Sequence, residues 1–211
     1  MIIRIAYYPD PVKSRTPGYP KQDVANVLKL DPTLSLRRID NLDNLSTDNY
    51  DVVLFPGGFA PNTLEELGDD GEAKIKAFVN AGGGFVGICA GAYLGSNWGW
   101  GLIDAELPYI NRWARGKTNS CILDLKNVTP LGAEFNARKK IICRYANGPL
   151  MVCGTGVQPL ATFMSELRGK KNKYPSEMSG TAAIAMGKCG KGTVVLQSPH
   201  LESSSDVYVQ S

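Results

Sequence analysis

The residues best suited to do chemistry are a cysteine between two glycines and the single histidine of the chain. Residues 87–91 read Gly-Ile-Cys-Ala-Gly, so Cys89 follows an apolar run and precedes small residues that suit a helix. A nucleophile between glycines at a strand-to-helix turn has the form of a nucleophile elbow, where a Cβ beside it would collide with nearby backbone. A helix N-terminus also favours the thiolate. We therefore predict that Cys89 is a nucleophile with a strained backbone of positive φ.

A thiolate nucleophile also needs a proton carrier, and His200 is the one histidine that could serve. Glu202 follows two residues later and would point the same way from an extended segment, so its carboxylate could orient the imidazole. The three residues together predict a Cys-His-Glu catalytic triad. The simpler alternatives are an inert buried cysteine, a satisfied core or surface histidine, and a solvated glutamate.

Composition limits the classes of protein and site that fit. The chain has 211 residues, 43% of them hydrophobic, which suits one well-packed domain over residues 1–211 or a domain with an elaborate insertion. The net charge is +3, and the basic stretches at residues 138–140 and 168–173 lack interleaved aromatic residues, so we expect no nucleic-acid binding. Five cysteines without C-x-x-C spacing and one histidine give no zinc set, so we expect no metal and no other cofactor.

The N-terminal sequence and the lengths of the apolar segments bear on where the protein is located in the cell. It opens directly on a strand pattern without the apolar region and cleavage site of a signal peptide, and no apolar segment approaches transmembrane length. We therefore expect a cytoplasmic protein that does not associate with a membrane.

The first half of the chain alternates strand and helix patterns, which predicts a parallel sheet with helices on its faces. The strands are expected at residues 2–7, 34–39, 51–55 and 85–88, and the helices at residues 22–30 and 71–80. Ligand sites in such sheets lie at the carboxyl ends of the strands, and both Gly57-Gly58 and Cys89 fall there.

The second half is richer in strands, expected at residues 120–125, 139–145, 150–153, 160–164, 182–186 and 193–197. A hairpin loop is expected at residues 187–192, and the last strand would deliver His200 to its carboxyl end. Cys143 and Cys153 flank a predicted turn at residues 146–149 and could be neighbours across strands, and we expect them to be buried thiols rather than a disulfide.

Three pieces in this order resemble the class I glutamine amidotransferase-like superfamily: residues 56–58 after a strand, the elbow at residues 87–91, and His200-Leu201-Glu202. Residues 55–58, 78–93, 145–149 and 198–202 more narrowly resemble the amidotransferase-like domain at the N-terminus of eukaryotic biotin–protein ligases and its free-standing relatives. The likeness extends over residues 1–203. It implies an α/β fold of flavodoxin-like, three-layer form, with a mainly parallel central sheet flanked by helices and a β-rich second half.

The resemblance also implies roles for individual residues. Cys89 corresponds to the nucleophile, His200 to the base and Glu202 to the residue that orients it. The backbone N–H groups of Gly58 and Ala90 correspond to the oxyanion hole, which stabilises a tetrahedral intermediate.

Further candidates for substrate binding lie close to the elbow in sequence or on the Gly-Gly turn: Gly57, Tyr93 and Trp98. The aromatic residues here, Trp100 included, are more simply read as covering the edge of the sheet.

These features predict a cysteine amidohydrolase that forms a thioester on Cys89 from a small carboxamide or γ-glutamyl-type substrate. The alternative is a binding or regulatory module that recognises a small metabolite or a partner protein without turnover. A third interpretation is a cysteine sensor or glycation-repair enzyme, which would need a carboxylic acid beside Cys89. No synthase or ligase region accompanies the motifs, so we expect neither ammonia transfer nor biotin ligation from this chain alone.

Overall fold

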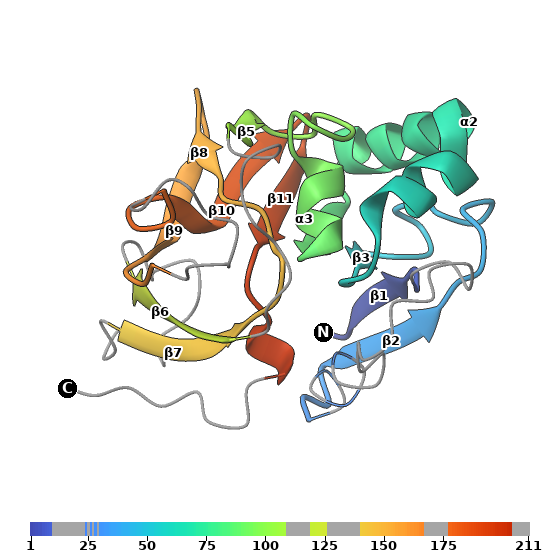
Figure 1. Cartoon of the computed structure of the whole chain (residues 1–211). Helices are drawn as coiled ribbons and strands as arrows, with labels where there is room; N and C mark the ends of the chain where they lie inside the picture. Colours follow the sequence, from blue (N-terminus) through green and yellow to red (C-terminus); the bar gives the residue numbers. More distant parts are fainter. Residues whose placement is uncertain are drawn as a thin grey trace.

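The computed structural model describes residues 1–9, 24, 26, 28, 30–108, 119–125, 140–166 and 177–203. These residues form one nine-stranded sheet in the order β2-β1-β3-β4-β11-β10-β9-β6-β7, with helices packed on it (Figure 1). The sheet strands are β1 (Ile3–Tyr7), β2 (Leu34–Arg38), β3 (Val52–Phe55), β4 (Gly84–Ile88), β6 (Asn119–Leu125), β7 (Lys140–Tyr145), β9 (Gln158–Phe163), β10 (Ala182–Cys189) and β11 (Gly192–Gln197). The remaining elements are α2 (Ala60–Ala81), α3 (Ala90–Gly95), the short pair β5 (Ala105–Glu106) and β8 (Val152–Cys153), and the 3₁₀ turn η2 (Leu201–Ser203).

The half of the sheet that carries the elbow is parallel. Strands β2, β1, β3, β4 and β11 all pair in parallel, and Phe55 of β3 lies opposite Gly87 of β4. The expected α/β fold with a parallel sheet is therefore confirmed. The register places the ends of β3 and β4, and with them the Gly-Gly turn and Cys89, side by side at the same edge.

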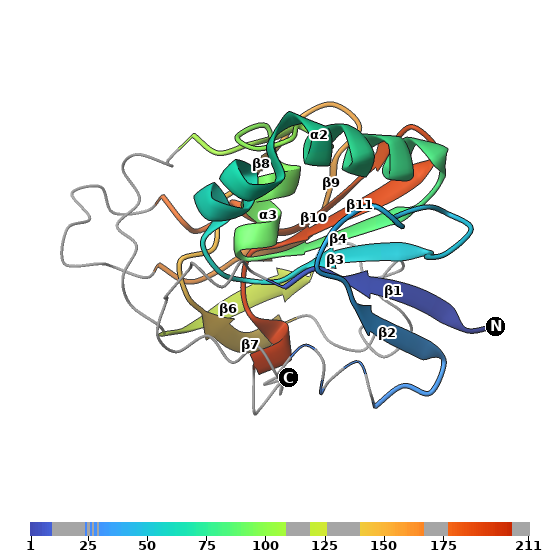
Figure 2. The same ribbon diagram turned by 90° about the vertical axis from the view of Figure 1, so that its right-hand side faces the viewer.

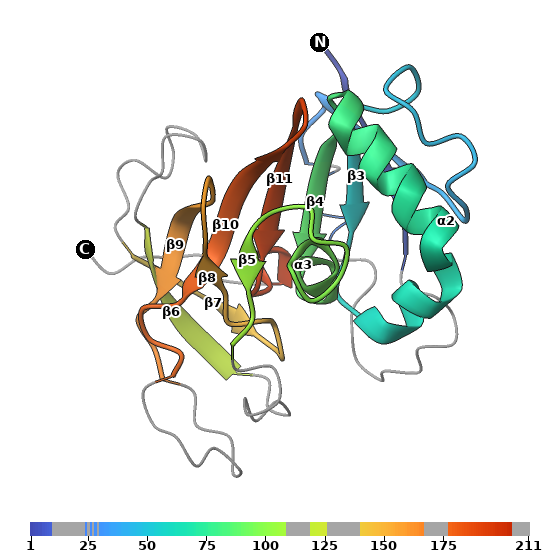
Figure 3. The same ribbon diagram turned by 90° about the horizontal axis from the view of Figure 1, so that it is seen from above.

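The two faces of this parallel half are covered by different helices. Val53, Phe55 and Phe85 face a core shared with α2 and α3, whereas Leu54 and Ile88 face a second core that includes Val24. Figures 2 and 3 show α2 and α3 together on one face of the sheet. Continuous apolar runs form these strands because both faces are buried.

Two helices depart from their expected extents. The helix expected at residues 71–80 is the second part of α2, which begins at Ala60 with a proline in its first turn and is kinked at Gly68, where φ is 55°. The helix expected at residues 22–30 is seen at Val24, Asn26 and Leu28, and its other members lie outside the described residues except Leu30, which is in a turn. The basic stretch at residues 168–173 also lies outside them. None of the described helices is long and apolar enough to cross a membrane.

The second half of the sheet is antiparallel and curls back toward the site. Strands β11, β10, β9, β6 and β7 pair antiparallel in that order, and the hairpin between β10 and β11 turns tightly at residues 190 and 191. The edge strand β7 then meets the segment that follows β11 through an isolated bridge between Arg144 and His200. Figure 1 shows β7 passing below β9 and β10 towards η2. This closure holds the end of β7 against the candidate triad.

Cys143 and Cys153 are both free thiols, as expected, but Cys153 is only partly buried and the two are not neighbours across strands. Cys143 lies opposite Cys121 in the β6–β7 ladder, with their sulfurs 3.5 Å apart, whereas Cys153 pairs with Ala105 in the separate β5–β8 pair. The chain after residue 149 leaves the large sheet, so the turn at residues 146–149 does not form a hairpin between these cysteines. Hydrogen bonding with Cys121 and burial raise the pKa of the Cys143 thiol, which suits an inert core residue.

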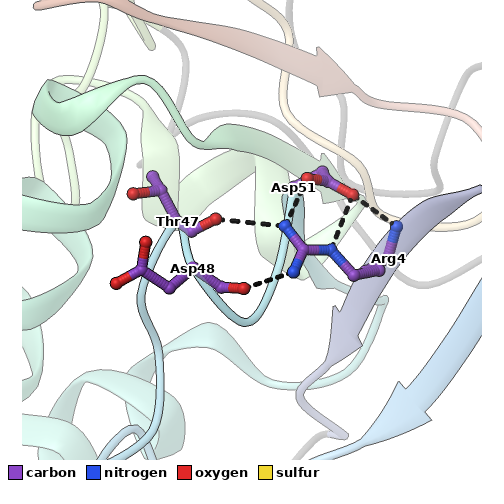
Figure 4. A network of polar contacts seen from close by, with 4 residues as sticks. All are labelled: Arg4, Thr47, Asp48 and Asp51. Atoms are coloured by element: carbon purple, nitrogen blue, oxygen red, sulfur yellow. Dashed lines mark hydrogen bonds and ion pairs between the residues drawn. The ribbon is translucent and has the colours of Figure 1, made fainter.

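The opposite end of the parallel strands is tied together by Arg4. Its guanidinium forms an ion pair with Asp51 at 2.8 Å and donates to the backbone carbonyls of Thr47 and Asp48 (Figure 4). Hydrogen bonds from Arg4 hold the pKa of the Asp51 carboxyl at about 2, so the pair stays charged across the physiological pH range. The network fixes the entry of β3 beside β1.

Candidate active site

Cys89 occupies a sharp turn between a buried strand and a short helix. It lies between the end of β4 at Ile88 and the start of α3 at Ala90, with φ 50° and ψ −98°. Its N–H donates to the carbonyl of Gln197 at 2.8 Å, which ties the turn to the end of β11. A non-glycine residue in this conformation is strained and persists only where its surroundings enforce it. The predicted positive φ is therefore confirmed.

The flanking glycines are required by close backbone approach. A Cβ on Gly87 would collide with the carbonyl of Gly91, and a Cβ on Gly91 would collide with the carbonyl of Phe55 at the end of β3. Gly91 also donates its N–H to Pro56 at 3.3 Å. The elbow is thus packed directly onto the neighbouring strand end.

His200 and Glu202 form a buried pair. The exposed fraction of the side chain is 1% for His200 and 6% for Glu202, and Nδ1 of the imidazole lies 2.8 Å from Oε1 of the carboxylate. The backbone N–H of His200 donates to the carbonyl of Arg144 at 2.8 Å. Because Nδ1 contacts the carboxylate, Nε2 is the ring nitrogen that can exchange a proton with a nucleophile.

The local backbone of this pair differs from the sequence expectation. Glu202 lies in the 3₁₀ turn η2 rather than in an extended segment. The chain turns after Pro199 because His200 joins β7 and Leu201 packs against the core of the antiparallel half. The contact between the two side chains is nevertheless made.

The surroundings of His200 favour its charged form. Burial lowers the pKa of the imidazole, but hydrogen bonds and charge interactions with Cys89 and Glu202 more than offset this and raise it to about 10. The structure therefore brings all three predicted triad residues together. A protonated imidazole beside the sulfur is the arrangement that stabilises a thiolate.

The two predicted oxyanion donors lie at adjacent strand ends. Gly58 follows β3 with φ 156°, and Ala90 is the first residue of α3. Across the described part of the chain, neither backbone N–H donates to a protein acceptor. Both N–H groups lie at the carboxyl ends of β3 and β4, on the side of the sheet that carries the elbow.

A loop after β7 forms a further wall of the site. The Cys89 thiol donates to the carbonyl of Ala146 at 3.3 Å, and the Tyr93 hydroxyl donates to the carbonyl of Asn147 at 3.0 Å. Asn147 has φ 63°, and Cys89 and Asn147 are the positive-φ residues other than glycine within the described ranges. A Cβ on Gly148 would collide with Ser198, two residues before His200. The sequence predicted only a turn here, although these residues belong to the family resemblance.

Of the remaining residues considered for substrate binding, some lie close to the elbow and one belongs to the core. Tyr93 is buried and its ring meets that of Trp98 edge-on at 5.7 Å, while Trp98 keeps 38% of its surface exposed. Gly57 is buried in the turn after β3. Trp100 packs instead against Phe55 and Phe85 and is 2% exposed, so it is an ordinary core aromatic.

An acidic cavity of about 230 Å³ opens near the same edge of the sheet, after β1 and β2. Its lining includes Tyr8, Asp40, Asp43, Glu66, Asp70 and Lys74. Lys74 forms ion pairs with Asp43 and Asp70, and the Tyr8 hydroxyl donates to Glu66. Its polar groups are thus largely paired with one another. No sequence pattern signals this cavity, because its residues come from three separate segments.

The region around the elbow matches a known protein family. Residues 43–99 match the family model described as biotin-protein ligase, N terminal. The match covers β3, α2, β4 and α3, and therefore includes Cys89 and the Gly-Gly turn. A curated biotin–protein ligase from Schizosaccharomyces pombe is 25% identical over 169 residues, which are 74% of this chain and 26% of that protein. The chain thus spans about a quarter of the length of this relative.

Solved structures share the fold at low sequence identity. A glutamine amidotransferase from Thermotoga maritima has a TM-score of 0.59 and 14% identity, covering 96% of this chain and 77% of that one. A cytoplasmic protein from Salmonella typhimurium LT2 has a TM-score of 0.61 and 12% identity, covering 92% and 86%. The chain therefore has the α/β fold seen in glutamine amidotransferases.

Proposed function

We propose that this protein is a cysteine amidohydrolase in which Cys89, His200 and Glu202 act as nucleophile, proton carrier and orienting carboxylate. The observation that supports this most strongly is the buried His200–Glu202 pair beside a strained, glycine-flanked cysteine. A strained backbone and a charged imidazole buried in a core both lower the stability of the folded protein, and such features cluster at functional sites.

The proposed first step is attack of the Cys89 thiolate on the carbonyl carbon of a small carboxamide or γ-glutamyl-type substrate. The oxygen of the tetrahedral intermediate accepts hydrogen bonds from the N–H groups of Gly58 and Ala90. Each such donor lowers the barrier by about 3 kcal/mol. Nε2 of the His200 imidazolium gives its proton to the departing nitrogen, the C–N bond breaks, and a thioester remains on Cys89.

Hydrolysis of the thioester completes the cycle. The now neutral His200 takes a proton from water, the hydroxide attacks the thioester carbon, and the C–S bond breaks to release the acid and restore the thiolate. Glu202 keeps the imidazole oriented through both steps and stabilises its charged form.

One contact favours a different function, a binding module without turnover. The Cys89 sulfur lies 3.3 Å from the Ala146 carbonyl, an arrangement that suits a protonated thiol acting as donor rather than a thiolate. A module of this kind would use the same fold to hold a metabolite or a partner protein.

Reaction with a glutamine-analogue electrophile separates these functions. We expect intact-protein mass spectrometry to show one covalent adduct with such a compound, a diazoketone or chloroketone of a glutamine analogue, and peptide mapping to place it on Cys89. Cys89→Ser should abolish the adduct, while Cys189→Ser, which removes a partly exposed thiol elsewhere, should leave it unchanged. An adduct spread over several cysteines, or none at Cys89, contradicts the amidohydrolase.

A further inference from the structure

The side chain of Gln197 lies between the elbow and the His-Glu turn, and this one residue contacts both. Its backbone carbonyl accepts the N–H of Cys89 at 2.8 Å. Its side-chain Nε2 donates to Oε2 of Glu202 at 3.3 Å and to the carbonyl of Pro199 at 3.1 Å.

We propose that Gln197 is a positioning residue that aligns the carboxylate of Glu202 with His200 while its backbone fixes Cys89, an inference that rests on the proposed triad. The two oxygens of Glu202 are thereby used by two different partners. Oε1 contacts Nδ1 of His200, and Oε2 accepts from Gln197, so the carboxylate is held from both sides.

The position of Gln197 on β11 makes this bridge possible. Strand β11 lies next to β4, and Gln197 pairs in register with Ile88, the residue before Cys89. Thr193, Val195 and Gln197 alternate with buried residues and share the partly exposed face of the strand. The side chain of Gln197 can therefore extend past Pro199 to Glu202 while its backbone remains paired with β4.

The groups around Glu202 differ in how they interact with its carboxylate. His200 contacts it from its own turn, and Cys143 of β7 interacts with its charge from the neighbouring strand, through a thiol whose pKa is raised by Cys121 and by burial. A neutral thiol cannot neutralise the carboxylate. The Gln197 amide donates to the oxygen that is turned away from Nδ1 of His200. It can therefore fix the rotation of the carboxylate without competing with the imidazole.

The test uses two substitutions that preserve the length and shape of the side chain. Gln197→Met removes the donor, and Gln197→Glu replaces it with a second carboxylate beside Glu202. We measure the rate of iodoacetamide alkylation of Cys89 between pH 5 and 9. Gln197→Met should lower the rate at pH 7 by about three- to tenfold and move the rising limb to higher pH, since one hydrogen bond to a charged group is lost. Gln197→Glu should lower it further because two carboxylates repel.

The control is Thr193→Val, which removes a side-chain hydrogen bond to Lys188 at the other end of the same strand face and should leave the profile unchanged. A merely structural role would lower thermal stability without moving the pH profile. If Gln197→Met and wild type give the same pH profile while Cys89 is alkylated slowly in His200→Ala, the inference is wrong and the proposed triad stands. If His200→Ala also matches wild type, the proposed function itself fails.

Discussion

Replacing His200 with Ala is expected to slow alkylation of Cys89 by iodoacetamide at pH 7 by about tenfold or more. The reason is that a cysteine without a cationic partner is only a few per cent thiolate at this pH. In the wild-type protein the charged form of the His200 imidazole is favoured next to the sulfur, and a neighbouring cation makes a cysteine more reactive. Peptide mapping with isotopically labelled iodoacetamide gives the rate at each of the five cysteines in one experiment.

Glu202→Gln provides the matched variant, because it keeps the shape of the side chain, removes its charge and replaces one acceptor oxygen with an amide NH2 group. It should slow alkylation less than His200→Ala does. In the double variant the rate should equal that of His200→Ala alone, since the carboxylate acts only through the imidazole. Additive losses would mean that Glu202 and His200 do not act as a unit. Equal rates at Cys89 in wild type and His200→Ala would favour the binding module.

Replacing Gly91 with Ala is expected to lower the free energy of unfolding by about 3 kcal/mol, near the upper end of the usual range for overpacking. The new methyl group would meet the backbone carbonyl of Phe55, which cannot rotate away because it lies at the end of β3. Urea denaturation followed by circular dichroism measures the loss.

Gly101→Ala is the control for this substitution. Gly101 has φ 60° and open space around the position of a Cβ, so alanine there meets only the backbone cost of about 1 kcal/mol. Equal losses for the two variants would show that the contact between the elbow and β3 is not tight, and would remove the packing argument for the strained conformation of Cys89.

The parts of the site that local sequence encodes could be predicted. The two glycines that flank Cys89 within a five-residue motif indicate a close approach of backbone segments. The continuous apolar runs before Gly57 and Cys89 indicate strands that are buried on both faces. The pair His200 and Glu202 could be identified by spacing, although the predicted extended backbone is wrong.

What could not be predicted depends on the path of the second half of the sheet. The closure of β7 onto His200 is a bridge from Arg144, far away in the sequence, and no periodicity in either segment signals it. The same closure brings Ala146 to Cys89, whereas Cys143 lies opposite Cys121 because β7 pairs with β6. The sequence predicts Gln197 only as the end of a strand, because its contacts with Cys89 and Glu202 depend on the turn that follows.

The single histidine of the chain allows the most direct test of the proposed triad, because one ring resonance reports on His200 alone. We expect the proton NMR signal of its imidazole to titrate well above the ordinary pKa of 6.5, towards about 10, because Cys89 and Glu202 stabilise the charged form. Cys89→Ala should lower that midpoint, since the interaction with the sulfur is lost. A midpoint at or below 6.5 in the wild-type protein, unchanged by Cys89→Ala, would contradict the pairing of Cys89 with His200 on which the proposed function depends.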